Sequence, residues 1–195
     1  MKILPTIMLC FILWNANSQI NNDYLKIDEK APQITGIDQF DNIIDSKEIL
    51  KENKILLVFY RGNWCPYCKK HLLELQENLE KLESKGIRVL VVTPEKSNKI
   101  EETTKNFQST FSILHDVDNK IMNDYKVAFE VNEQNVLNYL NFTQKKIEEY
   151  NEINNNILPV PATYLIDKNA LISYVHYNPD YKKRASFDEI MKLLD

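Results

Sequence analysis

The fold is set by residues 55–68, which read Ile55-Leu-Leu-Val-Phe-Tyr-Arg-Gly-Asn-Trp-Cys-Pro-Tyr-Cys68. The first six residues are a continuous apolar run, which is typical of a strand buried on both faces of a sheet. Residues 61–64 follow as a turn. Pro66 then stands where a helix can begin, because a proline has no N–H to leave unpaired in the first turn. The stretch predicts a buried strand, a turn, and a helix that begins at Cys65 or just after it.

Strands and helices alternate along the rest of the chain. Regularly spaced leucines extend the helix after Pro66 to Gly86, which is placed to end it with a left-handed cap. The other expected helices are residues 46–52, 95–108, 118–125 and 186–194, with Ser46 and Ser186 as N-caps. The other expected strands are residues 87–93 and 111–114 and a hairpin of 162–166 with 171–177. Residues 132–153 are expected to form an inserted helix, or a helix and a loop.

This order predicts an α/β fold with a central mixed β-sheet and helices on both faces. The turn that carries Cys65 follows a central strand, at the carboxyl end where such sheets place their sites. The chain has 195 residues and a formal charge of −4, which fits one compact domain. The acidity gives no reason to expect nucleic acid as a partner.

The scarce residues exclude several kinds of site. Gly36, Gly62 and Gly86 are far apart, whereas phosphate loops and dinucleotide fingerprints need clustered glycines. The three histidines are dispersed, which argues against a multi-histidine metal centre. We therefore expect neither a metal nor a cofactor.

The N-terminus has the layout of a secretory signal peptide. Lys2 precedes the apolar run 3–14, which is too short to span a membrane. Small residues near Ser18 predict a signal peptide of residues 1–18, a mature domain of 19–195, and a secreted or periplasmic location. Cys10 would then be removed. The alternative is a buried N-terminal segment of a cytoplasmic protein.

Cys65 and Cys68 carry the strongest chemical pattern in the chain. A helix start favours a thiolate at Cys65, and Cys68 follows one turn later on the same face. This spacing lets the two sulfurs form and break a disulfide. A zinc half-site lacks two further ligands, and a static disulfide would close too short a loop to stabilise much. Two inert buried thiols would not explain the position at a helix start.

These residues resemble the thioredoxin-fold superfamily and, more narrowly, the peroxiredoxin-like branch of the alkyl hydroperoxide reductase/thiol-specific antioxidant family. Three stretches carry the resemblance, together with Ala31-Pro32: residues 57–68, residues 113–118, and residues 158–167 continued by 176–184. The resemblance implies a thioredoxin-like fold over most of the mature chain. It also implies a peroxide substrate and a thioredoxin-type dithiol as reductant.

The chain departs from typical peroxiredoxins at three positions. Where that family carries Pro, Thr and Arg to polarise a bound peroxide, this chain has Arg61, Cys65 and a residue near Pro161. Cys68 occupies the position of the peroxidatic cysteine. A proline before a strand is instead a thioredoxin-like feature, which implies a cis Val160–Pro161 bond packed against the cysteines, with a trans loop proline as the alternative. Pro159 is expected to be a plain loop residue.

Four further residues are candidates for the site. His71 could tune Cys68 or shuttle protons, or it could be solvated on a helix face. Arg61 could lower the pKa of a thiolate by its charge, or it could lie on the surface. Trp64 is expected to shield the site or to contact substrate, and Pro66 to shape the helix start. Tyr181 and Arg184 belong to the family-like tail, and the sequence assigns no chemistry to them.

The favoured function is a thiol-dependent peroxidase that uses the Cys65–Cys68 pair. Alignment with peroxiredoxins favours Cys68 as the first attacker, whereas residue chemistry favours Cys65 and protein disulfide exchange. Thiol-disulfide exchange without peroxidase activity is therefore the alternative. A non-enzymatic binding module with the same fold is an alternative of another class, which the intact cysteine pair argues against.

Overall fold

The structure is a computed structural model that describes residues 23–132 and 140–194. Within these ranges, no helix combines the length and the apolar character that crossing a membrane requires. The expected signal peptide, residues 1–18, lies outside the described residues.

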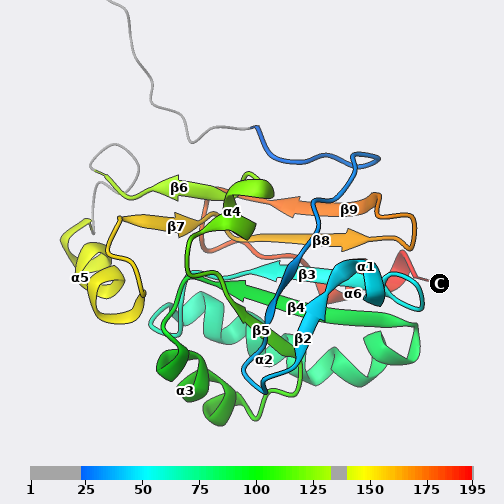
Figure 1. Cartoon of the computed structure of the whole chain (residues 1–195), viewed down its shortest axis with the longest axis horizontal. Helices are drawn as coiled ribbons and strands as arrows, with labels where there is room; N and C mark the ends of the chain where they lie inside the picture. The colour runs from blue at the N-terminus through cyan, green and yellow to red at the C-terminus, as the bar shows by residue number, and fades with distance from the viewer. Residues whose placement is uncertain (1–22, 133–139, 195) are drawn as a thin grey trace, which may run out of the picture.

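A five-stranded sheet forms the centre of the molecule (Figure 1). Its strands, in spatial order, are β5 (Ser112–His115), β4 (Ile87–Thr93), β3 (Lys54–Phe59), β8 (Ala162–Ile166) and β9 (Ile172–Tyr177). β4 is parallel to β3 and β5, whereas β8 is antiparallel to β3 and β9. The expected central mixed sheet is confirmed, and the strand before the cysteine pair is its middle strand.

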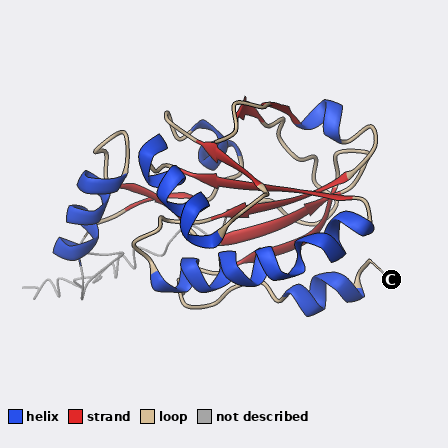
Figure 2. Cartoon of the chain, turned by 90° about the horizontal axis from the view of Figure 1, so that it is seen from below, coloured by secondary structure: helices blue, strands red, loops and turns tan. Residues whose placement is uncertain are grey.

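Helices cover both faces of this sheet (Figure 2). Side chains of β3 alternate between the faces: Leu56 and Val58 pack in one core cluster, and Ile55, Leu57 and Phe59 pack in the other. The first cluster includes α2 (Pro66–Ser84), α3 (Ser97–Phe107) and α6 (Phe187–Lys192), and the second is covered by α1 (Ser46–Ile49) and α4 (Lys120–Asp124). This two-sided burial explains why β3 is a continuous apolar run.

Two small two-stranded sheets lie outside the central sheet and were not predicted. β1 (Thr35–Ile37) pairs with β2 (Ile43–Asp45), and β6 (Ala128–Glu130) pairs with β7 (Ile157–Pro159). Strands of three residues are too short to show a periodic pattern. Pro159 pairs with Ala128 in the second of these sheets, so its assignment to a loop was wrong.

The helix ends follow local capping signals. The predicted cap at Ser186 is confirmed, since its hydroxyl accepts a hydrogen bond from the Glu189 N–H. Gly86 has a φ of 72°, as expected for a left-handed cap. The predicted cap at Ser46 was wrong: the Asp45 carboxylate caps α1, because the Ser46 hydroxyl accepts the Ile34 N–H instead.

The insert contains α5 (Leu140–Tyr150), which confirms a helix there, while residues 133–139 lie outside the described part of the chain. Two other helices begin later than predicted. α3 begins at Ser97 because Glu95 is still extended and bridges Asn151, and α4 is limited to residues 120–124.

The Val160–Pro161 peptide bond is trans, so the implied cis bond is corrected. The trans form is the ordinary preference of an X–Pro bond, by about 0.5–1 kcal/mol. Here it also continues the extended path from β7 into β8. Along this path the Val160 N–H donates to the Val127 carbonyl at 2.8 Å, and Ala162 pairs with Phe59.

Candidate active site

The loop after β3 delivers the two cysteines to the start of α2. Cys65 is the N-cap of α2, in an extended conformation, and Pro66 is the first helical residue, as predicted. The Cys65 carbonyl accepts a hydrogen bond from the Cys68 N–H at 3.0 Å, which closes the first turn. Because β3 is the middle strand, the pair lies at the carboxyl end of the sheet's centre.

Neither cysteine is in a disulfide, and both are buried, with exposed fractions of 0% for Cys65 and 1% for Cys68. A hydrogen bond from Cys68 and the charge of Arg61 lower the pKa of Cys65 to about 5, against the opposing effect of burial. Burial, together with the negative charge of Cys65, raises the pKa of Cys68 well above its ordinary value. The resting pair is therefore a Cys65 thiolate that accepts a hydrogen bond from the Cys68 thiol.

Arg61 is buried beside this thiolate, so the surface alternative was wrong. Its Nη2 donates to the Cys65 Sγ at 3.4 Å. Its guanidinium also lies over two rings, 5.1 Å from the centre of Trp64 and 4.3 Å from that of Tyr181. These contacts hold a positive charge in place next to Cys65.

Trp64 connects the cysteine loop to the insert. Its ring packs edge-to-face against Phe142 of α5, with the ring centres 6.1 Å apart. It also packs on a small core cluster that includes Ile147 and Leu158. Trp64 thus lies between the Arg61 guanidinium and α5, and its role in shielding the cysteines stays a prediction.

Arg184 is a site residue that the sequence analysis did not assign. Its Nη2 donates to the Cys68 Sγ at 3.4 Å, across 116 positions of sequence. Its Nη1 is held by the backbone carbonyl of Tyr181. The only sequence signal was its place in the family-like tail, because nothing in the chain pattern shows which helix that tail touches.

His71 is buried, with an exposed fraction of 3%, so the solvated alternative was wrong. Its ring stacks on Phe187 with 5.0 Å between the ring centres. Burial, and then the charges of Arg184 and His176, lower the pKa of His71 to about 3. The ring is therefore neutral near pH 7, and any tuning of Cys68 by His71 must act without a charge.

Pro161 lies buried at the same end of the sheet, one residue before the pairing of Ala162 with Phe59. Its carbonyl accepts a hydrogen bond from the Asn178 N–H at 3.4 Å, which ties it to the end of β9. A role of Pro161 in shaping the cysteine site stays a prediction.

Glu95 is a second residue that the sequence analysis missed. Its carboxylate is fully buried and accepts hydrogen bonds from the Asn63 N–H at 2.7 Å and from the Tyr60 hydroxyl at 2.8 Å. Burial raises the pKa of Glu95 to about 7, although these hydrogen bonds oppose the rise. Glu95 thus anchors the loop that carries Cys65. Its place just after β4 was a usable signal, because parallel strands end at the same edge.

Replacing this carboxyl by an amide is expected to change how stability depends on pH. Between about pH 4.5 and pH 7, folded Glu95 holds a proton that the unfolded chain has released, so the free energy of unfolding falls as pH rises through this window. Glu95→Gln removes that fall, which amounts to on the order of 3 kcal/mol. Urea denaturation across this window measures it, with Glu101→Gln, an exposed site on α3, as the control. If the free energy of unfolding depended on pH in the same way in wild type and in Glu95→Gln, the raised pKa of Glu95 would be contradicted.

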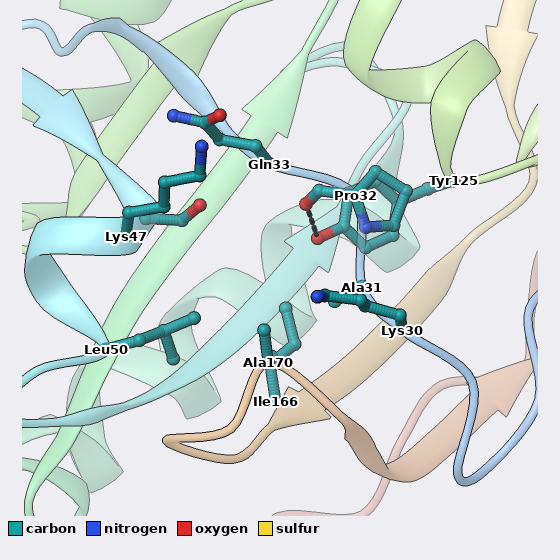
Figure 3. Close-up of a pocket in the computed structure, with 10 residues that line it drawn as sticks. Lys30, Ala31, Pro32, Gln33, Lys47, Leu50, Tyr125, Ile166 and Ala170 are labelled. Carbon is teal, nitrogen blue, oxygen red and sulfur yellow. Dashed lines mark hydrogen bonds between the residues drawn. The ribbon is translucent and has the colours of Figure 1, made fainter.

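One surface pocket lies elsewhere and contains none of these groups. It has a volume of about 440 Å³ and is lined by residues that include Lys30, Lys47 and Ile166 (Figure 3). Ile166 pairs with Ile55, which places this pocket at the amino end of β3, opposite the cysteines. Within the described residues, no cluster of three or more histidine, cysteine or acidic side chains is arranged to hold a metal ion.

Fold and site together define a thioredoxin-fold protein whose cysteine pair begins a helix at the end of the central strand. Residues 27–175 match the sequence profile of the AhpC/TSA family. The chain belongs to that family, which confirms the resemblance drawn from the sequence.

Two curated relatives show how distant the similarity is. The chain is 23% identical to the putative chloroplastic peroxiredoxin Q of Oryza sativa subsp. indica, covering 84% of this chain and 64% of that protein. It is also 23% identical to the chloroplastic peroxiredoxin Q of Sedum lineare, covering 74% of this chain and 64% of that protein. The chain thus spans less than two thirds of the length of these relatives.

Solved structures of a peroxidoxin and of a thioredoxin domain both support the fold. Peroxidoxin BcpB of Mycobacterium tuberculosis superposes with a TM-score of 0.66 at 12% identity, covering 88% of this chain and 97% of that one. The thioredoxin domain of a thiol-disulfide oxidoreductase of Bacteroides vulgatus superposes with a TM-score of 0.59 at 16% identity, covering 88% and 99%. At such identities the likeness establishes the thioredoxin-like fold.

Proposed function

We propose that this protein is a thiol-dependent peroxidase in which Cys65 attacks the peroxide and Cys68 resolves the product. The observation that carries the proposal is the hydrogen-bonded pair itself: Cys65 accepts from both Cys68 and Arg61, which favours its thiolate at neutral pH. The alignment with typical peroxiredoxins assigns the attack to Cys68 instead. The raised pKa of Cys68 argues against that assignment.

The reaction has three steps. The Cys65 thiolate attacks the terminal peroxide oxygen, the O–O bond breaks, and the alkoxide or hydroxide that leaves takes up a proton, so that Cys65 becomes a sulfenic acid. Cys68 then attacks the Cys65 sulfur, a disulfide forms, and the hydroxyl leaves as water. A thioredoxin-type dithiol reduces the disulfide and is itself oxidised, which restores both thiols.

Protein disulfide exchange is the second candidate, and the departures at Arg61, Cys65 and Pro161 favour it. Burial of the two sulfurs favours a peroxide, since a molecule as small as hydrogen peroxide needs less opening of the site than a protein disulfide does. A non-enzymatic binding module would not need a lowered pKa at Cys65.

Two assays on the wild-type protein separate these functions. With a thioredoxin-type dithiol and its reductase supplied, we expect consumption of hydrogen peroxide in proportion to protein, and insulin reduction close to the background rate. One equivalent of peroxide should remove both thiols together, with a mass loss that matches a Cys65–Cys68 disulfide. Insulin reduction without peroxide turnover would replace the proposal by disulfide exchange. Neither activity would favour the binding module.

We also propose that residues 1–18 are a signal peptide and that residues 19–195 form the exported, mature protein. The support is the pattern of one lysine, an apolar run and small residues before Gln19. The mass of the protein isolated from its native host tests this, since an uncleaved N-terminus would contradict it.

A further inference from the structure

The segment between β9 and α6 reaches both sulfurs of the site. Arg184 of this segment donates to the Cys68 Sγ at 3.4 Å. Tyr181 of the same segment lies under the Arg61 guanidinium, which donates to the Cys65 Sγ. Each sulfur therefore has its own guanidinium, and residues 181–184 contribute to the surroundings of both.

The two sulfurs need these charges at different moments. Cys65 must be a thiolate when the peroxide arrives, and Arg61 is beside it. Cys68 must lose its proton later, when it attacks the oxidised Cys65, although it is almost completely buried. At that moment Cys65 is a neutral sulfenic acid, so its negative charge no longer opposes ionisation of Cys68. Burial is then the main remaining obstacle, and a fixed positive charge at the sulfur offsets it.

We propose that Arg184 is a catalytic residue of the resolving step, in which its guanidinium stabilises the Cys68 thiolate that attacks Cys65. The inference rests on the proposed function for its chemical setting. In this step the electron pair of the Cys68 thiolate forms the S–S bond, and the S–O bond of Cys65 breaks. The departing hydroxide combines with the proton that Cys68 released, which gives water.

Backbone carbonyls hold the Arg184 guanidinium in place. The carbonyls of Tyr181 and Lys183 both accept from Arg184 Nη1, while Nη2 of the same group donates to the sulfur. The Tyr181 ring packs edge-to-face on Tyr67 of α2, with 5.6 Å between the ring centres. The planar guanidinium is thus fixed on one side by backbone and directed at Cys68 on the other, a task for which a lysine is poorly suited.

Other titratable groups around Cys68 do not replace this charge. Cys65 carries a negative charge in the resting state and none after oxidation. His71 and His176 are both held neutral, since burial lowers the pKa of each. Arg61 also lowers the pKa of Cys68, but its hydrogen bond goes to Cys65.

The first test measures the pKa of Cys68 directly, without peroxide. In a Cys65→Ser background, the residue beside Cys68 is neutral, as it is after oxidation. The ultraviolet absorbance of the thiolate then reports ionisation of Cys68. Adding Arg184→Gln is expected to raise the pKa of Cys68 by about one unit or more. Lys182→Gln, which removes a neighbouring exposed charge, should leave the pKa of Cys68 unchanged. Arg184→Lys should restore part of the shift. An unchanged pKa in Arg184→Gln would overturn the proposal, whether or not the protein is a peroxidase.

The second test follows one turnover in the two-cysteine protein. After one equivalent of hydrogen peroxide, Arg184→Gln should form the Cys65 sulfenic acid within about twofold of the wild-type rate but form the disulfide about tenfold or more slowly. Trapping with a sulfenic-acid reagent should then label Cys65 in this variant and not in Lys182→Gln. Equal rates of disulfide formation would contradict the role of Arg184. Absence of sulfenic acid in every protein, wild type included, would refute the peroxidase instead and leave the pKa test to decide on Arg184.

Discussion

Cys65→Ser is expected to lower peroxide turnover by about 10³-fold or more, because it removes the sulfur that is ionised at neutral pH. Cys68→Ser is expected to behave differently. Its Cys65 still reacts with one equivalent of peroxide, but no disulfide forms, so a sulfenic acid persists and turnover with a dithiol is lost. Single-turnover peroxide consumption and whole-protein mass, measured side by side, distinguish the two variants.

The pH dependence of the first step gives an independent check. Only the thiolate attacks, so the rate in the wild-type protein should be level above about pH 6 and fall about tenfold per unit below pH 5. In Cys68→Ala the hydrogen bond that most lowers the Cys65 pKa is removed, and the fall should begin at higher pH. The opposite pattern, in which Cys68→Ser loses the first step and Cys65→Ser keeps it, would support the peroxiredoxin alignment over the geometry.

Gly62→Ala is expected to cost about 2–4 kcal/mol of stability and to disturb the cysteine site. Gly62 has a φ of 149°, and a methyl group there would lie 2.4 Å from Trp64 Nε1 and 2.9 Å from Glu95 Oε1. Either the indole or the carboxylate must move. Because Glu95 holds the Asn63 N–H, its displacement would loosen the loop that carries Cys65.

Gly86→Ala is the matched control for this change. Gly86 also has a positive φ, of 72°, but an added methyl group would meet no atom within 4 Å. Its cost should be limited to backbone strain of about 1–2 kcal/mol, with the pKa of Cys65 unchanged. Urea denaturation and the thiolate titration measure both effects. If Gly62→Ala and Gly86→Ala lost the same stability, and Gly62→Ala left the titration of Cys65 unchanged, the steric conflict of a Gly62 side chain with Trp64 and Glu95 would be contradicted.

Local signals predicted the scaffold well because their causes lie within a few residues. A fully apolar strand from residue 55 requires burial on both faces, and within a helix a proline such as Pro66 suits only the first turn. Gly86 and Ser186 end and begin helices through their own backbone or side-chain chemistry. These elements, in this order, predict a mixed sheet in which the cysteine pair follows the carboxyl end of a central strand.

Other features had no local cause. β6 and β7 pair because two segments far apart in the chain meet, and the Val160 N–H finds its partner at Val127, again far away in the sequence. For His71 the sequence left open a solvated position on a helix face or a role beside Cys68, and only the fold shows that Phe187 of the last helix covers it. In each case the partner lies far along the chain, where spacing carries no information.

The sequence by itself determined which residues can do redox chemistry, since a cysteine pair at a helix start needs only its own local geometry. The tertiary structure decided which of the two cysteines has the lowered pKa and which has the raised one. Arg61 donates to the Cys65 sulfur and Arg184 to the Cys68 sulfur, and Glu95 anchors the loop that carries Cys65. The physical reason is that a pKa depends on burial and on charges within a few ångströms, and folding brings those groups together from β3, β4 and the segment before α6.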